Sequence, residues 1–307
     1  MSDHLIAIDV LCIGHASYDL IFSISHHPAA DEKLSADQLI GCGGGPAANA
    51  AITVAKLGLT SAFAGYLGLD VYGDSHFAEL EATQVDTRLI VRDRSPTPLS
   101  TILVKPDGKR ALINYKGNTQ AVKSDRVDFS PVECKVCLFD GHEPELALAF
   151  LQEKTDNAIP SILDAGSLHE GTRTLMHQVN YLVASEKFAQ QYAGDAKTAL
   201  TQLAEQSPVV VITLGERGLI WQRGLERGSL NAPPIKAIDT TGAGDAFHGA
   251  FAAAIANHLP WQEVLHYASA AGACCCQKMG ARIGIPSREE HQALLKLWQS
   301  NPASTKS

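Results

Sequence analysis

Short apolar runs alternate with helical patterns along most of this chain, and this alternation restricts the fold more than any other feature of the sequence. The apolar runs predict buried strands at residues 8–13, 61–65, 136–139, 161–163, 181–184 and 209–213. Helical patterns cover residues 46–57 and 72–83, and the first has Pro46 near its start and Gly58 just past its end. A repeated strand–helix order produces parallel strands with helices on both faces. We therefore predict an α/β fold, a three-layer α/β/α sandwich with a mostly parallel central sheet.

Two regions, near residues 18–40 and 99–115, break this order. Each contains two β segments with no helix between them, at 18–24 and 33–40 and at 99–104 and 110–115. The turn Pro106-Asp107-Gly108-Lys109 joins the second pair. A small separate β sheet is the expectation, and an edge hairpin is the alternative. Because no linker or internal repeat interrupts the chain, we predict one domain over residues 1–300 and a flexible tail at 301–307.

Charge and hydropathy exclude several classes of protein. The formal net charge of −8 argues against a nucleic-acid-binding protein, which is usually basic. The first residues lack a basic segment followed by a long apolar run, and residues 250–256 fall far short of the ~20 apolar residues that span a bilayer. We expect no membrane association and a cytoplasmic protein. Consecutive helical side chains point about 100° apart, so Cys274-Cys275-Cys276 predicts small buried side chains instead of a metal site.

A glycine-rich turn at residues 239–245 leads directly into an apolar helix. The backbone N–H groups of Gly242, Ala243 and Gly244 predict an anion site at the positive end of that helix. A bound anion repels a carboxylate, so Asp245 in the same turn requires a reason. It is suited to act as a general base that takes a proton from a hydroxyl attacking a phosphoryl group. A capped helix without chemistry is the alternative interpretation.

A second glycine cluster, Gly43-Gly44-Gly45-Pro46-Ala47-Ala48-Asn49-Ala50, lies far upstream. The two clusters together, in this order, resemble the paired signatures of the ribokinase-like (PfkB) carbohydrate kinase family, and the resemblance extends over about residues 10–286. It implies that Asp245 is the base and that the three preceding residues of the turn, Gly242, Ala243 and Gly244, form the anion hole. It implies sugar contacts from Asp19, Gly44, Gly45 and Asn49, and we add Asn114 at the end of a β segment. It implies ATP contacts from Thr213, Gly215 and Gly218, with the segment from Gly272 to Gly280 closing the adenine pocket.

The resemblance also implies metal ions, a lid and a partner. Where the family has an N-x-x-E motif, this chain has Ser185 and Phe188, and Glu186 remains as a candidate for Mg²⁺ through water. Asp239 is the candidate ligand for a monovalent cation such as K⁺. The two β regions are expected to cover the sugar site and to form a homodimer interface.

These features predict an ATP-dependent sugar kinase that phosphorylates a primary hydroxyl of a small carbohydrate such as a fructose-like ketose, ribose or a related sugar. A nucleoside kinase on the same fold is an alternative, but the 6% aromatic content leaves few side chains for a base pocket. A second alternative is a non-catalytic protein that binds a sugar or a nucleotide. The presence of Asp245 in an intact glycine-rich turn argues against it. Residues 43–48, 113–115 and 282–286 also look like the sulfofructose kinase branch, but His142 stands where an arginine would suit a sulfonate.

Overall fold

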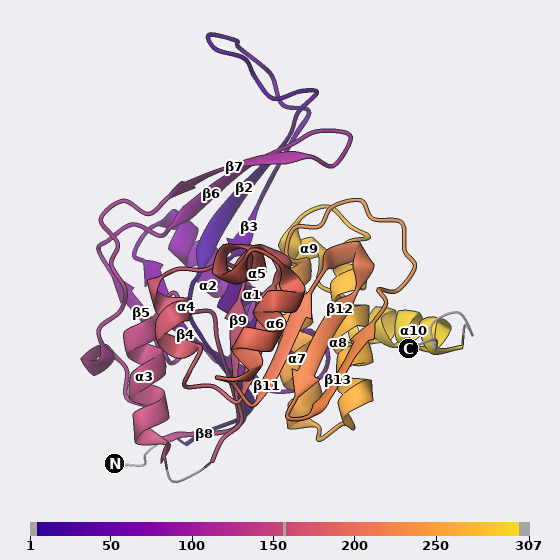
Figure 1. Ribbon diagram of the computed structural model, residues 1–307. Helices are drawn as coiled ribbons and strands as arrows, with labels where there is room; N and C mark the ends of the chain where they lie inside the picture. Colours follow the sequence, from indigo (N-terminus) through magenta and orange to yellow (C-terminus); the bar gives the residue numbers. More distant parts are fainter. Residues whose placement is uncertain (1–4, 156–157, 301–307) are drawn as a thin grey trace.

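The structure is a computed structural model that describes residues 5–155 and 158–300, and within them two β sheets are formed (Figure 1). The larger sheet has nine strands in the order β13-β12-β11-β10-β9-β8-β1-β4-β5. Its strands are β1 (Ile6–Ile13), β4 (Ser61–Gly68), β5 (Ile90–Asp93), β8 (Val132–Phe139), β9 (Ser161–Ala165), β10 (Tyr181–Ser185), β11 (Val209–Thr213), β12 (Leu219–Arg223) and β13 (Glu226–Leu230). The strands from β5 to β11 in this order are parallel, and only β12 is reversed, since it pairs antiparallel with both β11 and β13. The predicted mostly parallel α/β architecture is confirmed.

Helices cover both faces of the larger sheet. One face carries α1 (Pro46–Lys56), α2 (Val71–Ala82), α7 (Ala243–Ala256), α8 (Trp261–Cys275) and α10 (Arg288–Gln299). The other carries α3 (Pro144–Glu153), α4 (Glu170–Leu175), α5 (Glu186–Ala193) and α6 (Ala196–Ala204). The short helix α9 (Ala281–Gly284) follows α8. Each face therefore has its own hydrophobic core, as expected when the strands are apolar on both sides.

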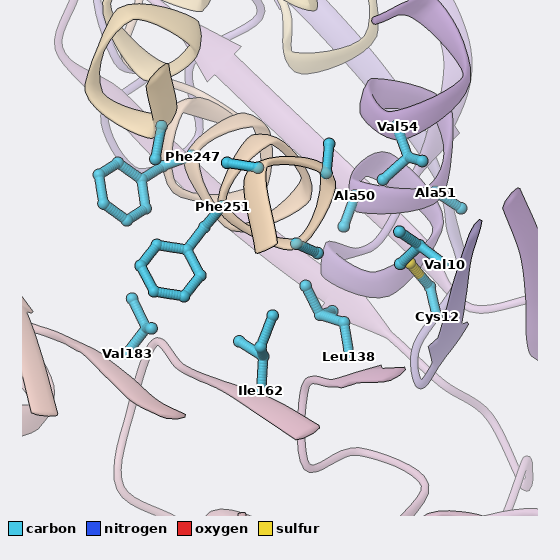
Figure 2. Packing of buried hydrophobic residues seen from close by; sticks show 14 of the residues in the cluster. Val10, Cys12, Ala50, Ala51, Val54, Leu138, Ile162, Val183, Phe247 and Phe251 are labelled. Carbon is cyan, nitrogen blue, oxygen red and sulfur yellow. The ribbon is translucent and has the colours of Figure 1, made fainter. Parts of the chain in front are cut away.

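Helices α1 and α7 pack closely over the centre of the sheet. Figure 2 shows Phe247 and Phe251 of α7 and Ala50 of α1 lying above strand residues such as Leu138 and Ile162. Small side chains allow this approach. A Cβ added to Gly249 of α7 would lie 2.6 Å from the backbone oxygen of Ala50. The close contact brings the N-terminal turns of the two helices together, and both glycine clusters of the sequence lie there.

The smaller sheet lies beyond the carboxyl end of β1. Its strands are β3 (Gln38–Gly44), β2 (Ser17–Ser23), β6 (Leu99–Val104) and β7 (Arg110–Tyr115), in that order. Strands β2 and β6 are parallel and the other pairs are antiparallel. The β segment expected at 33–40 begins only at Gln38, because β2 ends at Ser23 and these two residues form the last pair of the ladder. Residues 33–37 are therefore not strand.

All seven cysteines lie in the described ranges and carry free thiols, and Cys274 and Cys275 are buried while Cys276 is half-buried. The predicted tail at 301–307 lies outside the described residues. In the part of the chain that is described, no helix has the length and apolar character needed to cross a bilayer.

Candidate active site

The glycine-rich turn at residues 239–245 forms the start of α7, as the sequence predicts. Gly242 has a left-handed conformation with φ 77°, and a Cβ there would lie 2.5 Å from the Cβ of Ala281. Only glycine fits both constraints. Of the three predicted anion donors, the N–H of Ala243 already donates to the backbone oxygen of Thr240 at 3.3 Å. Asp245 lies in the first turn of the helix.

Asn49 and Asp245 meet between the two helices. The Nδ2 atom of Asn49 donates to Oδ2 of Asp245 at 2.7 Å. Burial raises the pKa of Asp245 above its ordinary value, and the hydrogen bond from Asn49 opposes this shift. The Oδ1 atom of Asn49 is buried and has no hydrogen-bond partner within the described residues. Because a buried acceptor without a donor costs free energy, this oxygen is suited to receive a hydroxyl from a ligand.

A buried pair lies behind Asp245. The Nδ1 atom of His248 lies 2.6 Å from the backbone oxygen of Gly244 and 3.2 Å from Oδ2 of Asp164, and its Nε2 lies 3.1 Å from the backbone oxygen of Val183. Burial raises the pKa of Asp164 to about 7, and the charge of His248 opposes this rise. These contacts fasten the first turn of α7 to strands β9 and β10.

Several residues predicted to contact the sugar lie on the smaller sheet and at the start of α1. Asp19 of β2 is buried and accepts a hydrogen bond from the hydroxyl of Ser17 at 3.1 Å. Burial raises its pKa to about 6. A Cβ added to Gly44 would lie 2.4 Å from the carboxylate oxygens of Asp19, so these two predicted residues are in close contact. Gly45, with φ 96°, caps α1 one turn before Asn49.

Asn114 belongs to the same row of the smaller sheet as Asp19. In the strand register Asp19 pairs with Ser100, and Ser100 pairs with Asn114. Paired residues of neighbouring strands project to the same face of a sheet. Ser100 also forms a side-chain hydrogen bond with Asp19. The row Asp19–Ser100–Asn114 therefore presents polar groups on one face, and the sequence predicts two of them, Asp19 and Asn114, as sugar contacts.

Arg282, which begins the segment 282–286 noted in the sequence, and its partners were not predicted to form part of the site. Arg282 of α9 is 8% exposed, and its Nη2 lies 2.9 Å from Nε2 of His76. Its Nη1 lies 3.7 Å from Glu79, whose two carboxylate oxygens accept the N–H of Gly43 at 3.1 and 2.9 Å. This network holds the C-terminal end of β3 against α2 and α9. No sequence signal connects these residues, because positions 76 and 282 are far apart in the chain.

Asp140, which directly follows β8, was also missed as a functional candidate. Its Oδ2 accepts the N–H groups of His15 at 2.7 Å and Ala47 at 3.1 Å, and its Oδ1 accepts that of His142 at 2.9 Å. It thereby joins the loop after β1, the start of α1 and its own loop. The signal for it was present, since a carboxylate at the carboxyl end of a parallel strand often lies at a ligand site.

A cavity of about 770 Å³ adjoins the start of α7. Its lining residues are Thr213, Gly215, Glu216, Gly218, Leu219, Ala232, Pro233, Pro234, Ile235, Ala237, Thr240, Ala243, Gly244, Phe247, Ser269, Gly272, Ala273 and Cys276. Three predicted nucleotide contacts are among them. Gly280 is not among them, and its N–H donates to Oδ2 of Asp239 at 2.8 Å. The apolar residues between 232 and 237 that line the cavity were not predicted to contact the nucleotide.

The two predicted metal ligands both have partners in the chain. Oδ1 of Asp239 accepts the N–H and the hydroxyl of Thr241 at 2.9 and 2.7 Å, and it lies 3.6 Å from Nη1 of Arg110. Glu186, at the start of α5, forms an ion pair with Arg217. Across residues 5–155 and 158–300, no group of three or more His, Cys, Asp or Glu side chains is arranged to hold a metal ion.

Comparisons with known proteins agree on one family. The sequence profile of the pfkB family carbohydrate kinases matches residues 7–288. The chain is 27% identical over 300 residues to a ribokinase of Lactococcus lactis, covering 95% of this chain and 98% of that protein. It is 26% identical over 280 residues to a fructokinase of Solanum tuberosum, covering 82% and 86%. The solved structure of a Thermotoga maritima ribokinase superposes with a TM-score of 0.82 at 25% identity, covering 94% of this chain and 99% of that one.

Proposed function

Because the chain belongs to the pfkB family of carbohydrate kinases, we propose that it transfers the γ-phosphoryl group of ATP to a primary hydroxyl of a small carbohydrate. One observation carries the proposal. The helix turn that holds Asp245 also lines the 770 Å³ cavity, through Ala243 and Gly244. A nucleotide in the cavity and a sugar beside Asp19 would therefore meet at the carboxylate of Asp245.

The cavity suits a nucleotide in size and in lining. Its volume of about 770 Å³ falls within the range of roughly 300–1,000 Å³ that is typical of small-molecule sites. Apolar side chains such as Ile235 and Phe247 would contact the adenine. The phosphates would extend toward the N-terminus of α7, where backbone N–H groups and the helix dipole favour anions.

The sugar would occupy the space between the smaller sheet and the start of α1. The carboxylate of Asp19 would accept hydrogen bonds from sugar hydroxyls, and such charge-assisted bonds are the stronger ones. The unpaired Oδ1 of Asn49 would accept another. Asp245 would take the proton of the attacking sugar hydroxyl while the oxygen of that hydroxyl forms a bond to the γ-phosphorus of ATP. The bond from that phosphorus to the bridging oxygen breaks, and ADP leaves with the electron pair.

Metal ions enter this proposal in different ways. Mg²⁺ would arrive with ATP and neutralise charge on its phosphates, and Glu186 fits an outer contact to it only when released from Arg217. A monovalent cation on Asp239 fits less well. Its two carboxylate oxygens already accept hydrogen bonds from Thr241 and Gly280, and Arg110 already supplies a positive charge.

The smaller sheet is proposed to act as a lid and as the interface of a homodimer. Its inner face carries the row Asp19–Ser100–Asn114. Its outer face carries large apolar side chains, of which Leu39 is 57%, Ile113 63% and Tyr115 56% exposed. Large exposed apolar groups gathered on one sheet face are typical of a surface that is covered by a partner. A second copy of the chain, joined through the same face, would cover them with two-fold symmetry.

A coupled ADP-release assay over a panel of sugars and nucleosides tests the proposed function. Ribose and fructose are the first sugars to include, since ribokinases and a fructokinase are among the similar proteins. We expect Mg²⁺-dependent ADP release with at least one sugar, and release that is slower by roughly 10²–10⁴-fold with the Asp245→Asn variant. ADP release with nucleosides alone would identify a nucleoside kinase. No release with any acceptor, although ATP raises the melting temperature, would identify a binding protein.

A further inference from the structure

Arg110 joins the smaller sheet to the loop that precedes α7. It is the first residue of β7 and follows the turn of the β6–β7 hairpin. Its Nη1 donates a hydrogen bond to the hydroxyl of Thr241 and lies 3.6 Å from Oδ1 of Asp239. The hairpin turn itself also approaches the loop, because a Cβ added to Gly108 would lie 3.2 Å from the backbone oxygen of Ile238.

The contact continues directly into the anion turn. The hydroxyl of Thr241 accepts from Arg110 and donates to Asp239 at 2.7 Å, so hydrogen bonds run from Arg110 through Thr241 to Asp239. Asp239 is buried and also accepts the N–H of Gly280. Gly242, the next residue after Thr241, caps α7. Arg110 thus fixes the orientation of the last side chain before the proposed anion hole.

Charge gives the contact a further consequence. The proposed phosphate site is surrounded by carboxylates, since Asp164, Asp239 and Asp245 all lie around the start of α7. A guanidinium group beside Asp239 offsets part of this negative charge where the phosphates of ATP would approach. Because the group belongs to the smaller sheet, its position depends on where that sheet lies.

We propose that Arg110 is a positioning residue for phosphoryl transfer, which acts through Thr241 to hold the anion turn in place when the smaller sheet covers the site. This inference rests on the proposed kinase function. The contact of Arg110 with Asp239 differs from an ordinary surface ion pair, which contributes little to the stability of a protein. The distinction is that Asp239 is 3% exposed and that the contact adjoins the reacting groups.

The test compares Arg110→Ala and Arg110→Lys with Lys109→Ala, which removes the same charge from the neighbouring, exposed position. We expect kcat of Arg110→Ala to fall about 10- to 100-fold, the effect of losing one charge-assisted hydrogen bond, with the KM for sugar within about 3-fold of its original value. Arg110→Lys keeps the positive charge but lacks the planar guanidinium group. Its kcat should therefore lie between that of Arg110→Ala and that of the wild type. Guanidinium ion at millimolar concentration should partly restore Arg110→Ala and leave Lys109→Ala unchanged.

A double-mutant cycle identifies the route of the effect. If Arg110 acts through Thr241, the Arg110→Ala/Thr241→Val double variant should have about the kcat of the slower single variant. Fully additive losses, or a kcat of Arg110→Ala equal to that of the wild type, would overturn the inference.

Hydrogen exchange separates this inference from the proposed function. Without any ligand, the amides of residues 238–245 should exchange faster in Arg110→Ala than in the wild type, and Lys109→Ala should not differ. A wild type that phosphorylates no acceptor would refute the kinase proposal. The exchange data would then decide on their own whether Arg110 holds the turn, and unchanged exchange would overturn that claim.

Discussion

The amide nitrogen of Asn49 lies 2.7 Å from a carboxylate oxygen of Asp245, and this hydrogen bond connects the first turns of α1 and α7. The bond fixes the orientation of the carboxylate and stabilises its ionised form. It also commits one oxygen of Asp245, so that the other is available to receive a proton. Both signature glycine clusters of the sequence thus contribute to one contact.

Asp245→Asn preserves the shape of the side chain and removes its ability to take a proton. We expect turnover to fall by roughly 10²–10⁴-fold, the usual contribution of a general base. Affinities for sugar and ATP should change little, because the lost interaction operates in the transition state. Steady-state kinetics and calorimetric binding measure the two effects. Near-normal turnover would rule out the assigned role.

Asn49→Ala removes the donor that favours the charged form of Asp245. The pKa of Asp245 should therefore rise further above its ordinary value. The acidic limb of the pH profile of kcat should move to higher pH in this variant, since a base must be ionised to act. An unchanged acidic limb, in a variant that still binds both substrates, would show that Asp245 does not control it.

Asp19 should control the pH dependence of sugar binding. Burial raises the pKa of Asp19 to about 6 from the ordinary 3.8. The KM for sugar should rise as the pH falls through 6, because a protonated carboxyl is a weaker acceptor for hydroxyl groups. Asp19→Asn should show a high KM for sugar at every pH and an unaltered KM for ATP. A variant that loses ATP binding instead would show that the two subsites have been exchanged.

The raised pKa of Asp19 also predicts an effect on the stability of the fold. Ionisation of Asp19 should favour sugar binding but lower the free energy of unfolding. Between pH 3.8 and about 6 the folded protein binds more protons at Asp19 than the unfolded chain does. The contribution of Asp19 to stability is thus full below 3.8 and is lost as the pH rises through 6. Asp19→Asn should accordingly raise the denaturation midpoint at pH 8 more than at pH 4. Urea titrations at the two pH values measure the difference, and an equal change at both would refute the raised pKa.

Gly249→Ala should disturb the site from a distance. The added Cβ would lie 2.6 Å from the backbone oxygen of Ala50 and 2.7 Å from Cβ of Thr53, so α1 and α7 must separate. Overpacking of this kind costs about 1–3 kcal/mol. The denaturant midpoint should fall, and kcat should fall with it because Asn49 and Asp245 move apart. A stable variant with normal kcat would show that the two helices tolerate separation.

Strong local signals explain which elements could be predicted. Strand β11 and the β6–β7 pair have the predicted limits, because each is an apolar or alternating run bounded by turn residues. The edge strand β13 was missed, since Glu226–Leu230 is mostly charged or small and is stabilised by its pairing with β12. Local patterns do not reveal pairing partners, and they likewise did not indicate β5 or β12.

In the candidate site, residues within sequence motifs could be predicted, whereas contacts between distant segments could not. Residues that carry a motif, such as Asp245 and Asn49, were predicted and lie together. The ion pair of Arg282 with Glu79 and the contact of Arg110 with Thr241 join segments that no motif connects. The hydrogen bond from the N–H of Gly280 to Asp239 could not be predicted either, because the path of a loop depends on tertiary packing.

The row Asp19–Ser100–Asn114 stands on a sheet with a small core of its own, formed chiefly by Ile21, Cys42, Ile102 and Val104. The start of α7, by contrast, is embedded in the large core over the central strands. If the row binds the acceptor as proposed, substitutions in it would alter acceptor preference at little cost to global stability, whereas substitutions around Asp245 would endanger both the proposed chemistry and folding. Over evolutionary time such an architecture permits acceptor preference to diversify while the transfer reaction stays the same.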